Sequence, residues 1–354
     1  MERLTFAGIE RKNHPKCQDY LEGVYYDREV IDPFDEEIVK DIIEIYQMYS
    51  HQLLLAGGEW AWIQENKQNE YKKNLAHGNK EALITMYQNF FRNQISFGIS
   101  APDSDSESTR RDLVNDTLLD LDTLREFCGD IPLSELNTPF IGNPFGVLID
   151  SSLILYNSCR HYYHAHKIKE LTENIKRPVI LEIGGGYGGV FYYLNRLTKN
   201  YCYIVCDLAE TLFTNYYFTK KWSHMFHKEL KIKWVMEGEI TPNDTIKNDL
   251  ILVPSGNHRN IKCGFDVAYN SNSFSEMSFK DISDYFETIH QNQPTYIFHQ
   301  NSNFKLWENS SRGHTEVLAK EFPIPNEYKL IYQAISPWSG AGGRYREYLY
   351  QHIN

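Results

Sequence analysis

The sequence predicts an α/β fold, a doubly wound and mainly parallel sheet that is preceded by a mostly helical N-terminal region. Two observations predict it. From about residue 179 onward, apolar runs of strand length alternate with helical patterns. One of these runs, residues 179–183, leads into a cluster of glycines and then into an apolar helical segment. This order is typical of a strand, a tight loop and a helix.

Residues 1–145 are predicted to form the helical region, and residues 146–354 the sheet domain. Apolar residues recur at helical spacing in the first part, residues 104–108 form a polar loop, and prolines in 139–144 mark the boundary. This region carries no chemical motif of its own. It could pack or dimerise, or it could close a binding site as a lid. The expected helices are 35–56, 59–74, 80–93 and 112–127.

The second part is expected to alternate helices and strands. Ser278 with Asp281 three residues later indicates a capped helix start. Residues 231–235 are interpreted as a hairpin or an extra strand beside the preferred strand at 250–253. The expected helices are 151–174, 187–198, 209–226 and 278–290; the expected strands are 179–183, 201–206, 250–253, 265–270 and 295–299, with the last strands in 328–350 around a glycine turn at 340–343.

The glycine loop carries the most specific signal. Glu182, Gly184, Gly186 and Gly188 follow the pattern acidic-x-Gly-x-Gly-x-Gly. Glycine suits positions where a turn takes positive φ or where a ligand approaches bare backbone. Asp207 then ends the next apolar run, and an acid roughly 20 residues past such a loop suits the hydroxyls of a ribose. A nicotinamide fingerprint is the alternative, although it does not begin with an acid two positions before its first glycine. A turn that merely needs glycine is the plainer alternative.

Residues 181–189 resemble motif I of the class I S-adenosylmethionine-dependent methyltransferases, which have a Rossmann-like fold. More narrowly, the chain resembles the bacterial sugar O-methyltransferase family. Residues 207–212, 216–218 and 265–277 also carry this resemblance, although Ala209 stands where the family usually has proline. The resemblance implies methyl transfer from S-adenosylmethionine to a sugar hydroxyl, in the cytoplasm, for a bacterial surface polysaccharide such as a capsule.

Donor binding is assigned to the four loop residues and Asp207, with Ser255 and Asn270 as further candidates. The base that removes the acceptor's proton should follow the strands near residues 270 and 299, because ligands bind at the carboxyl ends of parallel strands. The candidates for it are Glu276, His299 and His258. A lone histidine in a strand is more often a hydrogen-bonded core residue, which is the alternative for His299.

The acceptor side is less well defined by the sequence. Asn301 is expected to hydrogen-bond a sugar hydroxyl, together with the amides of Asn270, Asn272 and Asn303, although capping of loops is the alternative for all four. Arg344 is expected to hold a phosphate of a nucleotide-activated sugar, such as a nucleoside-diphosphate heptose or deoxyhexose, and Arg346 and Arg312 are alternatives. Ordinary surface arginines and a glycan or free sugar remain open.

No metal ion is expected, because amides outnumber carboxylates after the fourth and fifth strands. His161, His164 and His166 resemble a metal cluster, but on a helix the third residue leaves the face of the first two, and no carboxylate accompanies them. Aromatic packing with a polar edge is the preferred interpretation.

Composition excludes several classes. The 354 residues carry a formal net charge of −11, which argues against nucleic acid and anionic membranes as partners. The six cysteines form no CxxC pair, so reduced thiols are expected. No stretch approaches the roughly 18 apolar residues of a membrane span, and the first residues lack an apolar signal region, so a cytoplasmic protein is expected. A homo-oligomer is left open. The rival functions are a small-molecule or N-methyltransferase, a nicotinamide-dependent oxidoreductase and a non-catalytic subunit.

Overall fold

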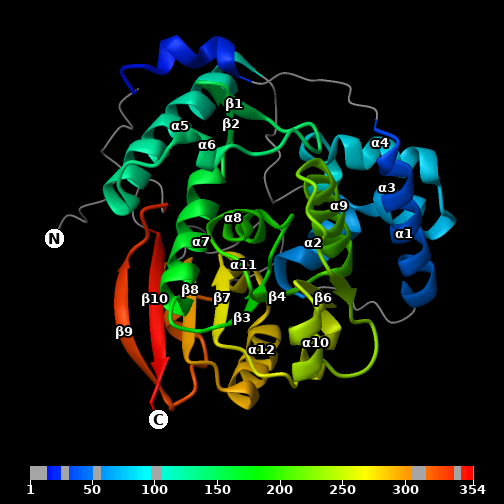
Figure 1. Ribbon diagram of the computed structural model, residues 1–354, viewed down its shortest axis with the longest axis vertical. Helices are drawn as coiled ribbons and strands as arrows, with labels where there is room; N and C mark the ends of the chain where they lie inside the picture. The colour runs from blue at the N-terminus through cyan, green and yellow to red at the C-terminus, as the bar shows by residue number, and fades with distance from the viewer. Residues whose placement is uncertain are drawn as a thin grey trace.

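The computed structural model describes residues 14–24, 32–50, 57–96, 106–304, 316–338 and 344–353. One eight-stranded sheet dominates it, in the order β5-β6-β4-β3-β7-β8-β10-β9. In this spatial order, the first six strands, β5, β6, β4, β3, β7 and β8, run parallel to one another. The last two, β10 and β9, pair antiparallel at one edge of the sheet (Figure 1). The strands are β3 (Val179–Ile183), β4 (Cys202–Asp207), β5 (Ile232–Trp234), β6 (Leu250–Pro254), β7 (Val267–Ser271), β8 (Tyr296–Ser302), β9 (Tyr328–Ile335) and β10 (Tyr345–His352).

The predicted fold class, a doubly wound and mainly parallel sheet after a helical region, is confirmed. Residues 250–253 are the strand beside β4, as preferred, and residues 231–235 supply the extra edge strand. The helices are α1 (Phe34–Tyr49), α2 (Gly58–Asn66), α3 (Asn69–His77), α4 (Lys80–Gln88), α5 (Glu107–Cys128), α6 (Leu133–Leu136), α7 (Ser158–Thr172), α8 (Gly189–Leu197), α9 (Ala209–Met225), α10 (Pro242–Lys247), α11 (Ser273–Glu276) and α12 (Phe279–Asn292). The glycine turn at 340–343 lies outside the described residues.

Both faces of the sheet are buried at its central strands β3, β4, β6 and β7, which is why these strands read as continuous apolar runs. One face carries Tyr203 and Val267 and packs in one core with α7, α8, α9 and the N-terminal helices. The other face carries Ile204 and Ala268 and packs against α12. Figure 1 shows α1, α3 and α4, in blue and cyan, gathered beside α9. The N-terminal helices therefore belong to the core on one face of the sheet.

Buried polar contacts attach the N-terminal helices to α9. The carboxylate of Asp35, which is 1% exposed, accepts hydrogen bonds from Tyr217 on α9 and Gln88 on α4, at 2.8 Å each. Lys221 on α9 forms ion pairs with Asp35 and Asp32. A buried carboxylate is costly without such partners, so these contacts fix the position of α1 against α9.

Two helix predictions were wrong. Residues 151–157 do not begin a helix, because β1 (Gly146–Ile149) and β2 (Ser152–Leu155) form an antiparallel hairpin there. Asp150 and Ser151 both take positive φ in its two-residue turn, as a type I′ turn requires, and the absence of glycine hid this signal. Residues 59–74 form two helices, because the chain turns at Lys67 and Gln68.

Because β3, β4, β6 and β7 run parallel, their carboxyl ends lie together at one end of the sheet. The chain proceeds from β3 through β4 to β6 on one side and returns to β7 on the other side of β3. Such a switch in direction opens a crevice at the carboxyl ends of the strands, which is where ligands bind in this class of fold.

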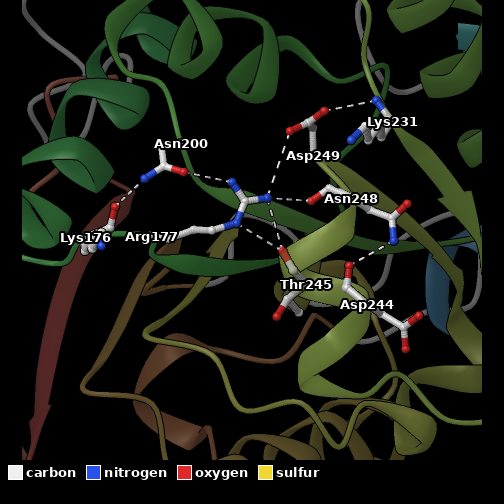
Figure 2. Close-up of polar contacts among 8 residues, drawn as sticks. All are labelled: Lys176, Arg177, Asn200, Lys231, Asp244, Thr245, Asn248 and Asp249. Carbon is white, nitrogen blue, oxygen red and sulfur yellow. Dashed lines mark hydrogen bonds and ion pairs between the residues drawn. The ribbon is translucent and has the colours of Figure 1, made fainter.

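At the amino end of β3, Arg177 connects this strand to the end of α10 (Figure 2). Its guanidinium donates to the carbonyl oxygens of Thr245 (3.2 Å) and Asn248 (3.0 Å) and to the side chain of Asn200 (3.1 Å). Asp249 lies 4.0 Å away. One planar cation thus satisfies carbonyls at the end of α10 and connects them to β3.

Replacing Arg177 by Met should lower the free energy of unfolding by about 1–3 kcal/mol, since hydrogen bonds to a charged donor are lost and two carbonyls remain part-buried. Urea denaturation measures this change. Lys176→Met is the matched control, because its exposed side chain takes no part in these contacts while its backbone carbonyl still accepts from Asn200. Equal midpoints for the two variants would contradict the role of Arg177.

Candidate active site

A cavity of about 510 Å³ lies at the carboxyl ends of β3, β4, β6 and β7. Its walls come from the glycine loop after β3, the residues after β6 and β7, the first turn of α7, and α2 of the N-terminal region. A volume of this size is typical of a small-molecule or cofactor site. Seven of the site residues predicted from the sequence line it: Glu182, Gly184, Gly186, Asp207, Ser255, His258 and Glu276.

The glycine loop has the conformation that the sequence predicted. Gly184, Gly186 and Gly188 all take positive φ, at 76°, 54° and 91°. A Cβ on Gly184 would lie 2.0 Å from the hydroxyl of Ser273, so a side chain cannot fit there. Gly188 caps α8 beside Asn215 and does not line the cavity.

Asp207 holds this loop against the end of β4. Its Oδ2 accepts from the backbone N–H of Gly186 at 2.9 Å, and its Oδ1 accepts from the N–H of Leu208 at 2.7 Å. Burial raises the pKa of Asp207 to about 7 against the opposing effect of these two hydrogen bonds. A carboxylate oxygen has more than one lone pair, so both can still accept from a ligand in the cavity.

Glu182 is the second acid at the cavity. It is 3% exposed, its Oε2 has no hydrogen-bond partner in the described part of the chain, and burial raises its pKa to about 8. A buried carboxyl oxygen without a partner is costly. Among the described residues, this oxygen is therefore left without a hydrogen-bond donor.

Glu276, at the end of α11, faces the cavity beside Trp60. The indole Nε1 of Trp60 donates to Glu276 Oε2 at 2.9 Å. Burial raises the pKa of Glu276 to about 7, and the Trp60 hydrogen bond opposes that rise. A carboxyl group with a pKa near neutrality suits proton transfer.

His258 also lines the cavity, after β6. Its Nδ1 lies 2.8 Å from the hydroxyl of Thr288, and its ring lies 4.5 Å from that of Tyr285. Burial lowers its pKa to about 4, so the imidazole is neutral at pH 7.

His299 does not line the cavity, and its predicted place in the site was wrong. It is fully buried in the sheet, stacked on Tyr348 at 4.9 Å and packed against Phe322. Burial lowers its pKa to about 3. Two buried faces leave no polar alternation along β8 that would reveal which way its side chains point.

The amides Asn270 and Asn301 brace the loop and do not line the cavity. Asn270 Nδ2 donates to the carbonyl of Ile183 at 2.8 Å, and its Oδ1 accepts from Asn301 Nδ2 at 2.8 Å. Both are buried, at 1% and 0% exposure. The expectations that Asn270 contacts the donor and Asn301 the acceptor were wrong, since their polar groups are used within the protein.

Arg344 is likewise occupied elsewhere. It donates from Nε to the hydroxyl of Ser302 at 2.6 Å and forms an ion pair with Glu316, outside the cavity lining. It is therefore not placed to hold a phosphate there. Arg346 does not line the cavity either, and Arg312 lies outside the described residues.

The N-terminal region reaches the cavity through the start of α2. Gly58 has φ of +62°, and a Cβ there would lie 2.3 Å from the carbonyl oxygen of Glu276. A Cβ on Gly57 would lie 2.2 Å from Asp281 Oδ2. Only glycines allow this approach, which brings Trp60 to Glu276. The sequence could reveal Gly57-Gly58 as a helix break, but not its partner more than 200 residues away.

The histidines of α7 have separate roles. His164 Nδ1 lies 2.6 Å from the hydroxyl of buried Tyr269, and His166 lies beside Glu170. His161 lines the cavity, with Nδ1 3.2 Å from the hydroxyl of Tyr187. Within the ranges that the structure describes, no group of three or more His, Cys, Asp or Glu could hold a metal ion. The packing interpretation fits His164, whereas the cavity role of His161 was missed.

Comparisons with known proteins give only distant similarities. No family model and no curated protein matches the chain. Solved structures that it resembles include the mitomycin 7-O-methyltransferase MmcR (11% identity, TM-score 0.36, 56% of this chain and 55% of that chain) and the glycopeptide N-methyltransferase MtfA with sinefungin (13%, 0.35, 55% and 87%). A third is the Burkholderia thailandensis 1,6-didemethyltoxoflavin-N1-methyltransferase with S-adenosylhomocysteine (14%, 0.36, 55% and 79%).

These three structures are methyltransferases. The chain spans about half the length of MmcR. Because the structural overlap is low, we base the fold on the strand order and the function on the site itself. Among the described residues, no helix is long and apolar enough to cross a membrane.

Proposed function

We propose that this protein is an S-adenosylmethionine-dependent O-methyltransferase that acts on a sugar hydroxyl. The sugar we propose is a nucleotide-activated one. One observation carries the proposal. The glycine loop, Glu182 and Asp207 converge on one wall of the cavity, while Glu276 faces the same cavity. This arrangement offers a donor site and a base within one enclosed space.

The residues at the wall fit the donor. The carboxyl of Glu182, with an oxygen that lacks a partner, suits the ammonium or a hydroxyl of the ligand. Asp207 suits the two ribose hydroxyls, and Gly184 to Gly186 expose backbone to them. Ser255 supplies a hydroxyl beyond β6, and His258 and Tyr285 supply two rings that are tilted against each other, which suits the adenine.

The chain's own contribution to the chemistry is alignment and proton removal. When bound, S-adenosylmethionine supplies a methyl group on a positively charged sulfur. Glu276 accepts the proton of the acceptor hydroxyl at a carboxylate oxygen, and Trp60 holds that carboxylate in place through Oε2. The start of α2 also covers the cavity near Glu276, which limits the access of water. The N-terminal region thus acts both as a packing element and as part of the site.

The identity of the acceptor rests on the resemblance of the sequence and on the polar and aromatic side chains of the cavity. Trp60 and Tyr156 offer flat faces for a sugar ring, and Asn272 and Ser273 offer hydrogen-bonding groups. A small-molecule or N-methyltransferase is the alternative, because the same fold serves many acceptors. Activity without a metal ion, a cytoplasmic location and a homo-oligomer stay predictions.

The function is tested by incubating the protein with methyl-labelled S-adenosylmethionine and a panel of nucleotide sugars, with and without EDTA. Mass spectrometry should detect one added methyl group on a nucleotide sugar, and EDTA should not prevent its transfer. Methylation of an amine in a matched panel of small molecules would favour the alternative. Transfer that requires added Mg²⁺ would contradict the metal-free prediction.

The rate should depend on pH through Glu276. Its carboxylate form is needed, so single-turnover rates should rise with pH through about 7 and then level off. Trp60→Phe removes a hydrogen bond that favours the carboxylate, so its pKa and the midpoint should move to higher pH. Glu276→Gln should slow transfer by a factor of about 10² to 10⁴.

Trp62→Phe is the matched control, because Trp62 lies on the same helix but not on the cavity. Its profile should match that of the wild type. A midpoint near pH 4 that is lost in His258→Asn would assign the base to His258 instead. An unshifted midpoint in Trp60→Phe would contradict the role of the indole.

A further inference from the structure

Among the described residues that line the cavity, Arg160 is a cation without an acidic partner. Arg160, Arg259 and Lys280 line the cavity in the part of the chain that the structure describes. Arg259 and Lys280 form ion pairs with Asp284, at 2.9 and 3.0 Å. Arg160 has no acidic partner within 4.0 Å among those residues, and its buried Nε has no hydrogen-bond acceptor.

Three tyrosines and a histidine lie within the electrostatic reach of Arg160. It lies on the first turn of α7, and its charge acts on Tyr187, Tyr269 and Tyr345 by lowering the pKa of each phenol against the larger effect of burial. Burial lowers the pKa of the adjacent His161, and the charge of Arg160 lowers it further, so that imidazole stays neutral. A partly buried guanidinium without an anion is costly, so a ligand that brings a negative charge is favoured here.

We propose that Arg160 binds an anionic group of the acceptor, a phosphate of the nucleotide-activated sugar. This inference rests on the proposed function. The guanidinium presents paired N–H donors that match the oxygens of a phosphate, and it stays charged at every physiological pH. It thereby takes the role that the sequence had suggested for Arg344.

The position of Tyr345 favours the acceptor over the donor as the source of the anion. Tyr345, Glu276 and Arg160 all line the same cavity, and both charged groups act on the pKa of the Tyr345 phenol in addition to the larger effect of burial. An acceptor that presents its hydroxyl to Glu276 can therefore extend past Tyr345 to Arg160. The other source of an anion is the carboxylate of the donor's methionine portion, and the experiment must separate the two.

Isothermal titration calorimetry with pyrophosphate as the probe tests the proposal. The full chain is titrated with and without saturating S-adenosylhomocysteine. Pyrophosphate should bind in both cases, and Arg160→Gln should weaken its binding more than about 10-fold, because charge-assisted hydrogen bonds are lost. Arg160→Lys should recover part of the affinity. Arg344→Gln is the control with the same change of charge and should bind pyrophosphate like the wild type.

The affinity for S-adenosylhomocysteine itself identifies the source of the anion. It should be equal in the wild type and in Arg160→Gln. If Arg160→Gln loses affinity for S-adenosylhomocysteine but not for 5′-methylthioadenosine, which lacks the amino-acid part, the anion is the donor carboxylate and the proposal is overturned. Failure of the wild type to bind pyrophosphate also overturns it. Failure of the wild type to bind S-adenosylhomocysteine, with pyrophosphate still bound at Arg160, would instead count against the proposed function alone.

Discussion

The site depends on the hydrogen bond from the backbone N–H of Gly186 to the carboxylate of Asp207. This contact, at 2.9 Å, joins the loop after β3 to the end of β4. It requires positive φ at Gly184 and Gly186, so that the loop turns sharply enough to place Gly186 beside the acid. The N–H of Gly184 also donates to the carbonyl of Cys206 at 2.8 Å. Together these bonds define the wall on which a ligand would lie.

A second set of buried contacts supports the same loop from the other side. Asn270 and Asn301 connect β7 and β8 to the carbonyl of Ile183, where β3 ends. Amides suit this role because each both donates and accepts, so one side chain can connect two strands. Asn270 and Asn301, which the sequence suggested as ligand contacts, thus support the loop from behind. The cavity itself is completed by side chains from α2 and α7.

Much of this arrangement was predictable from local pattern. Glu182, the glycine loop and Asp207 follow the apolar runs of β3 and β4 directly in sequence, so this wall of the cavity could be predicted from local pattern. Glu276 and His258 were placed in the cavity because each follows a strand at the correct edge. His299 was misplaced because both faces of β8 are buried, so the direction of a side chain leaves no trace in the sequence.

Two cavity residues, Trp60 and Arg160, were not predicted from the sequence, and for a different reason. Trp60 and Arg160 lie on helices before the motif, and their neighbours in the cavity are far away in sequence. Helical periodicity shows that such residues belong to a helix, but long-range packing decides which cavity they face. The glycines at positions 57 and 58 were readable as a helix break, whereas their close approach to α11 and α12 appears only in the folded chain.

The central claim is that the wall formed by the glycine loop, Glu182 and Asp207 binds S-adenosylmethionine. Calorimetric titration of the wild type and of Glu182→Gln with S-adenosylhomocysteine, and of the wild type with NAD, tests it most directly. The substitution preserves shape at a carboxyl whose Oε2 has no protein partner, so the fold should persist. The account predicts that the wild type binds S-adenosylhomocysteine and not NAD, and that Glu182→Gln binds about 10-fold or more weakly, since a hydrogen bond to a charged group is lost. Equal affinity in the two proteins, or binding of NAD in place of S-adenosylhomocysteine, would contradict it.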